Sequence, residues 1–202
     1  MVAATMSMPA GEHQDVLLEA IRLEGEAYRA LLAGDADGAA DGLRAAAERY
    51  RRSWELAPPR SFGRLIGMLK ALVIARDDAG AAAAAAYVRG EVDEADASPP
   101  AWYALAIAGL VEGDDGLARR AAGGMRAAGI EPFLRTAAAI EALAAGDGGA
   151  YASAVAAIVA DFEGRAEHLT GVPIADTAVM LERLAERRGV AARPASAVVP
   201  TR

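Results

Sequence analysis

Apolar residues recur along most of the chain at steps of three and four, the period of an amphipathic α-helix. The stretch 12–33 is a clear example, because its apolar positions fall on one helix face: Val16, Ala20, Leu23, Ala27 and Ala30. No stretch of useful length alternates apolar and polar residues, so we expect essentially no β-sheet. The pattern predicts an all-α protein.

Breaks that contain glycine, aspartate or proline divide this pattern into about nine predicted helices. We expect them at about 12–33, 37–56, 61–76, 78–92, 99–112, 117–128, 132–145, 149–169 and 177–188. Residues 1–10 are predicted to form a flexible tail and residues 11–189 a single helical domain. The segment 190–202 contains two prolines, which favour an extended C-terminal tail.

The segment 99–129 carries a family resemblance. The positions concerned are Trp102, Leu105, Ala106, Gly109, Gly113 and Ala118. Their spacing resembles a tetratricopeptide hairpin, which implies antiparallel helix pairs stacked as an α-solenoid. Acidic residues at the predicted turns, Asp35, Asp78, Asp114 and Asp147, are separated by 43, 36 and 33 residues, close to the roughly 34 residues of such a unit. An irregular helical bundle of the same helices fits the pattern as well.

The amino-acid composition excludes several classes of function. Alanine supplies 54 of the 202 residues, which favours helix, and the chain contains no cysteine, which excludes disulfides and thiol catalysis. The formal net charge of −7 is the reverse of the basic surface expected of a nucleic-acid binder. No uninterrupted apolar segment reaches the roughly 20 residues that span a bilayer, and the start of the chain lacks a signal-peptide pattern. We therefore expect a cytoplasmic protein with no nucleic-acid or membrane partner.

The tetratricopeptide resemblance implies a concave groove lined by the first helix of each hairpin. The groove residues in that frame are Tyr28, Arg64, Tyr103, Ile107, Phe133 and Thr136. Only Arg64 among them is charged, so the predicted partner is an apolar or amphipathic peptide or helix of another protein. Arg64 also lies beside Gly63 and Gly67, and it has two interpretations: a structural bond to the preceding helix, or a guanidinium that binds an anionic ligand group.

A second candidate site is the polar stretch 161–171. Asp161, Arg165 and His168 share one face if the predicted helix continues to Leu169. His168 could act as a general base held by a carboxylate, or it could cap the helix while the other two residues form a surface ion pair. Since a single helix supplies all three residues, the sequence favours the structural interpretation and a non-catalytic binding module; the alternative is an enzyme or a small-molecule-binding protein that uses this face. Histidine spacing gives no metal site, and no cofactor is predicted.

Two further hypotheses concern the C-terminal part. Residues 163–190 resemble the last helices of a helical immunity-protein family of bacterial toxin systems, which implies a protein that neutralises a partner by binding it. The segment 192–200 carries Val198 and Val199 between prolines. It is a candidate to pack back onto the helical array and occupy the groove.

Overall fold

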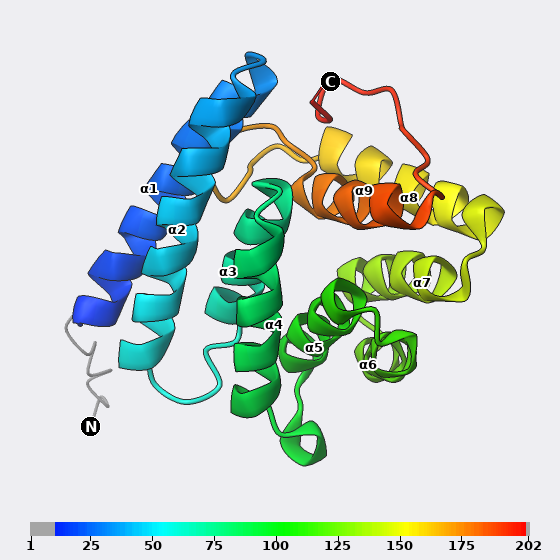
Figure 1. Ribbon diagram of the computed structural model, residues 1–202, viewed down its shortest axis with the longest axis horizontal. Helices are drawn as coiled ribbons and strands as arrows, with labels where there is room; N and C mark the ends of the chain where they lie inside the picture. The colour runs from blue at the N-terminus through cyan, green and yellow to red at the C-terminus, as the bar shows by residue number, and fades with distance from the viewer. Residues whose placement is uncertain (1–10, 201–202) are drawn as a thin grey trace, which may run out of the picture.

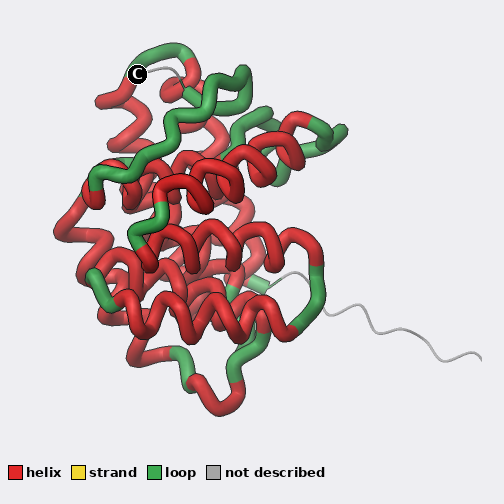
Figure 2. Tube along the Cα trace, turned by 90° about the vertical axis from the view of Figure 1, so that its right-hand side faces the viewer, coloured by secondary structure: helices red, strands yellow, loops and turns green. Residues whose placement is uncertain are grey.

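The computed structural model describes residues 11–200, and within this range every regular element is a helix and no strand is present (Figure 2). The helices are α1 (Glu12–Leu32), α2 (Ala36–Leu56), α3 (Gly63–Ile74), α4 (Asp78–Glu91), a short 3₁₀ helix η1 (Glu94–Asp96), α5 (Pro99–Glu112), α6 (Asp115–Ala127), α7 (Glu131–Ala145), α8 (Gly148–Glu163) and α9 (Asp176–Arg188). The all-α prediction is confirmed. The tail predicted for residues 1–10 lies outside the described residues.

The same local turn joins four pairs of consecutive helices. In each, an aspartate caps the second helix, and its carboxylate accepts a 2.9 Å hydrogen bond from the backbone N–H three residues later. These caps are Asp35, Asp77, Asp114 and Asp147. The residue expected from the sequence at the second of these turns is Asp78, one residue after the cap.

The residue before each cap has a left-handed backbone conformation. Gly34, Gly113 and Gly146 fill this position in three turns, with φ between 70° and 86°, and Arg76 fills it in the fourth with φ 57°. Glycine is the residue that adopts this conformation without steric cost. The turns bring each pair back antiparallel, as α1 and α2 illustrate at the left of Figure 1.

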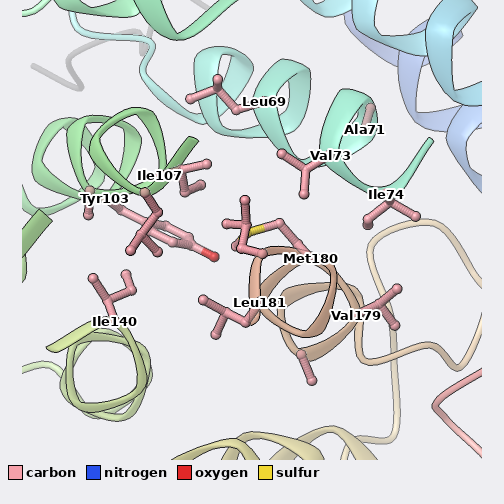
Figure 3. Close-up of a cluster of buried hydrophobic side chains, with 14 of the residues drawn as sticks. Leu69, Ala71, Val73, Ile74, Tyr103, Ile107, Ile140, Val179, Met180 and Leu181 are labelled. Atoms are coloured by element: carbon pink, nitrogen blue, oxygen red, sulfur yellow. The ribbon is translucent and has the colours of Figure 1, made fainter. Parts of the chain in front are cut away.

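The last helix closes the array. α9 follows α8 but packs against α3 and α7 as well (Figure 1). Figure 3 shows the core at this junction, where Leu69 of α3, Ile107 of α5 and Ile140 of α7 surround Met180 and Leu181 of α9. Exposure of these five side chains is zero, so α9 is held chiefly by apolar burial.

The predicted eighth helix is too long. α8 ends at Glu163, so Asp161 is helical, whereas Arg165 and His168 lie in the segment 164–175 that leads to α9. The four residues that follow α8, Gly-Arg-Ala-Glu, offer no large apolar side chain to bury, so the helix gains nothing by continuing. The segment instead crosses to α1, where a Cβ added at Gly25 would lie 2.9 Å from the carbonyl oxygen of Thr170.

The C-terminal segment 190–200 packs on the outer side of α9. The carboxylate of Glu182, which is 7% exposed, accepts hydrogen bonds from the backbone N–H groups of Ala192 at 3.0 Å and Arg193 at 2.7 Å. Farther along, the carbonyl oxygen of Val198 accepts a 2.7 Å bond from the N–H of Ala175. This segment is therefore docked, but against α9 and not in the groove that the sequence proposed for it.

Candidate functional site

A cavity of about 430 Å³ lies where α9 closes the array. Its walls come from α1, α3, α5, α7, α8 and α9 and from the segment 164–175. Helices from both ends of the described chain therefore contribute to the wall of one cavity.

Aromatic rings form much of the cavity wall. Tyr28 of α1, Tyr103 of α5, Phe133 of α7 and Phe162 of α8 all line it. The rings of Tyr103 and Phe133 meet edge to face with centroids 6.4 Å apart, a favourable aromatic geometry. Such a wall suits the apolar or aromatic body of an organic molecule.

Glu24 of α1 is a buried carboxylate on this wall, only 4% exposed. Its two oxygens accept hydrogen bonds from the hydroxyl groups of Tyr28 at 2.9 Å and Tyr50 at 2.7 Å. Burial, together with the negative charge of Asp176, raises the pKa of Glu24 to about 6, against the smaller opposing effects of Lys70 and the two tyrosines. At neutral pH Glu24 is therefore ionised at a cost in free energy.

Lys70 of α3, the only lysine in the chain, lies beside Glu24 and is 8% exposed. Its ammonium group donates to the carboxylate of Asp176 and, at 3.2 Å, to the hydroxyl of Thr177. Burial lowers the pKa of Lys70, but Asp176 and the other nearby groups more than offset this and raise the pKa above its ordinary value. Lys70 thus stays protonated at neutral pH, which rules it out as a base or nucleophile there. We call Glu24, Lys70 and Asp176 the inner charge cluster.

A second group of charged side chains lies in the more exposed part of the wall. Asp161 of α8 accepts one 2.6 Å bond from Arg135 of α7 and another from Arg165. The guanidinium carbon of Arg165 lies 3.7 Å from the centroid of the Phe162 ring, a cation–π contact. We call Arg135, Asp161 and Arg165 the outer charge cluster.

His168 also lines the cavity, and its ring is stacked near Phe162 with centroids 6.2 Å apart. Its Nδ1 atom is shielded from solvent and has no hydrogen-bond partner among residues 11–200. The carboxylate that the general-base interpretation pairs with it, Asp161, is bound by guanidinium groups at both oxygens.

The structure brings together most residues of the two candidate sites that the sequence treated as rivals. Seven of them line this one cavity: Tyr28, Tyr103, Phe133, Thr136, Asp161, Arg165 and His168. Arg64 and Ile107 do not. Arg64 Nε donates to the hydroxyl of Ser53 at 2.7 Å, which is the structural role, and Ile107 is fully buried in the core of Figure 3.

Sequence reasoning missed the inner charge cluster. Glu24 and Asp176 lie within helices that look ordinary along the chain, and no spacing rule connects residues so far apart. One signal was available. Lys70 is the only lysine beside 20 arginines, and it falls within a strongly apolar helix, α3.

Comparisons of the chain with models of protein families, with curated proteins and with solved structures found no match. In the described part, no histidine, aspartate and glutamate residues form a group of three or more that could hold a metal ion. None of the helices between residues 11 and 200 is both long and apolar enough to cross a bilayer.

Proposed function

We propose that this protein binds a small organic molecule in the cavity and holds it by its apolar body and by at least one polar group. The volume of about 430 Å³ falls within the roughly 300–1,000 Å³ of small-molecule sites. Such sites combine apolar and aromatic walls with a few placed polar groups, the composition found here.

One observation carries the proposal: ionised side chains, among them the buried Glu24 and Lys70, line a cavity whose wall is largely aromatic. Burying a carboxylate or an ammonium group is costly even when the group is paired, and apolar residues would stabilise the fold better. The core beside the cavity is packed with leucine, isoleucine, methionine and alanine. We attribute the charge retained at the cavity to a ligand, because perturbed ionisable groups in a cavity are typical of functional sites.

A peptide segment of a protein partner is the second candidate. Leu169, at the cavity wall, is 78% exposed, and a large apolar side chain in that position is a natural contact for a partner. A partner neutralised by binding, as the immunity-protein resemblance implies, is one case of this candidate. Here the cavity would receive a single side chain of the partner.

A cavity-filling substitution separates a small molecule in the cavity from binding elsewhere. Gly63 lines the cavity and has no atom within 4 Å of an added Cβ, so Gly63→Leu adds a side chain to the cavity wall without a clash at Cβ. Gly123→Leu is the matched control, since Gly123 is also helical and open but does not line the cavity.

The measurement is a thermal-shift screen of small amines, carboxylates, alcohols and amphipathic metabolites. We expect compounds that raise the melting temperature of the wild type and of Gly123→Leu, with the shift lost in Gly63→Leu. Compounds that stabilise all three proteins equally, or a screen without any stabilising compound, would contradict the proposal. For the peptide candidate, Leu169→Asp should weaken partner binding more than Gly63→Leu does.

A further inference from the structure

We infer that the ligand carries a cationic amine, and that this amine binds beside Glu24 and Asp176 in the inner charge cluster. The inference rests on the proposed function, because it names the class of molecule that the same cavity takes.

The first step is the balance of charge. The inner charge cluster holds two carboxylates, Glu24 and Asp176, against the single ammonium group of Lys70. Asp176 takes the direct ion pair, so the negative charge of Glu24 is left with hydrogen bonds from two neutral tyrosines. One unit of negative charge is therefore uncompensated in a site shielded from water, where electrostatic interactions are strong. A bound ammonium group would neutralise it.

The second step is that Glu24 has room in its hydrogen bonding for an ammonium group. A carboxylate oxygen can accept two hydrogen bonds, and each oxygen of Glu24 receives one from a tyrosine, so each retains a position for an N–H donor. Tyr28 and Tyr103 also line the cavity, and aromatic faces attract cations. The formal net charge of −7 also raises the local concentration of cations around the protein.

The third step concerns anionic ligands: the cationic side chains that could bind an anion are already bound to carboxylates of the protein. Lys70 is bound by Asp176 and Thr177. In the outer charge cluster, Asp161 binds both guanidinium groups, and Arg135 also bonds to Glu131 at 3.1 Å. Both guanidinium groups are therefore already in an ion pair with Asp161, and an anion would have to compete with that carboxylate.

The test compares three probes that share a phenyl ring and a short chain and differ in the end group: 2-phenylethylamine, 2-phenylethanol and 3-phenylpropionate. Binding is measured by titration calorimetry on the full chain at pH 7.5, where the first is a cation, the second neutral and the third an anion. We expect the amine to bind at least tenfold more tightly than the alcohol, roughly 1.4 kcal/mol, and the carboxylate to bind most weakly.

Variants then assign the preference to Glu24. Glu24→Gln should weaken amine binding at least tenfold and leave alcohol binding within twofold. Glu182→Gln is the matched control, because Glu182 is likewise buried and accepts a 2.9 Å bond from a tyrosine, Tyr151, but does not line the cavity. It should leave the binding of all three probes unchanged.

The outcomes distinguish a failure of the amine inference from a failure of the proposed small-molecule function. Tighter binding of the carboxylate, or equal binding of amine and alcohol, overturns the inference; if that binding is lost in Gly63→Leu, the proposed function stands. Absence of binding by all three probes at millimolar concentration counts against both. The probe comparison is made on the wild-type chain, so it decides the question even where Glu24→Gln does not fold.

Discussion

The cost of ionising Glu24 should be measurable as a gain in stability when its charge is removed. Glu24→Gln keeps the size of the side chain. The hydroxyl groups of Tyr28 and Tyr50 can each donate or accept a hydrogen bond, so one can donate to the amide oxygen while the other accepts from the amide nitrogen. The substitution therefore removes the charge without leaving either tyrosine unpaired.

The expected magnitude follows from the pKa of Glu24. That pKa is about 6 in the folded chain against an ordinary value of 4.5, and each unit corresponds to about 1.36 kcal/mol, which gives a penalty of about 2 kcal/mol above pH 6. Because the folded pKa is the higher one, the folded state binds the extra proton as pH falls, and the penalty disappears between about pH 6 and 4.5. The groups that face Glu24 and set this balance are Tyr28, Tyr50, Lys70 and Asp176.

Urea unfolding at pH 7.5 and at pH 4.5 tests this reasoning. At pH 7.5 we expect Glu24→Gln to unfold with a free energy up to about 2 kcal/mol larger than the wild type, and at pH 4.5 we expect the two proteins to be nearly equal. A variant that is less stable than the wild type by the same amount at both pH values would refute the argument, because the carboxylate would then be a net stabilising group.

The same substitution at Glu182 should lower the free energy of unfolding, whereas at Glu24 it should raise it. The donors at this carboxylate include the backbone N–H groups of Ala192 and Arg193, which cannot turn round to accept a bond. Glu182→Gln places an amide donor against one of them, and an unsatisfied buried donor costs about 1–3 kcal/mol. Opposite signs for one substitution at two buried glutamates would separate the effect of charge from a general effect of the change.

Three further predictions concern stability. Gly25→Ala should lower the melting temperature, because the added methyl group meets the carbonyl oxygen of Thr170 and overpacking costs about 1–3 kcal/mol, against about 1 kcal/mol gained in helix propensity; an unchanged melting curve would contradict this. Truncation after Gly189 should destabilise the protein, since Glu182 loses two backbone donors, while probe binding stays the same because the described part of the segment lies outside the cavity. Stability should also fall steeply in a pH titration above about pH 10, because burial first, and then negative neighbours, raise the pKa of four tyrosines that ionise normally once unfolded. These tyrosines are Tyr28, Tyr50, Tyr103 and Tyr151.

The helices could be predicted because the information is local. The apolar period and the turn residues lie within a few positions of the element that they specify, and the Gly–Asp turn before α6 shows this well, with Gly113 left-handed and Asp114 as the cap. The end of α8 was misplaced because residues 164–169 carry no local stop signal as strong as proline. The helix has nothing large and apolar to bury beyond Glu163, and the chain then crosses to α1 at Gly25, a tertiary contact that no local pattern indicates.

The cavity was predicted only in part, for the same reason. Aromatic residues on first helices of hairpins and the polar stretch 161–171 stand out in an alanine-rich chain, and both proved to line it. The inner charge cluster depends on α9 returning to α3, which joins Lys70 to a carboxylate 106 residues later. No periodicity within a helix indicates which distant helix will cover it.

The return of α9 has a consequence for when the cavity exists at all. Its wall includes Glu24 from α1 and Asp176 from α9, so the proposed binding site is complete only in a chain whose last helix has docked. A ligand that binds only this closed form is thermodynamically linked to docking and, at a hundred times its dissociation constant, adds about 2.7 kcal/mol to the stability of that form. This gain is larger than the penalty of about 2 kcal/mol for ionising Glu24. A bound ligand would therefore protect α9 from local unfolding. Backbone amides of α9 would exchange their hydrogens more slowly when the ligand is bound, although Glu24, the proposed contact of its amine, lies in the first helix.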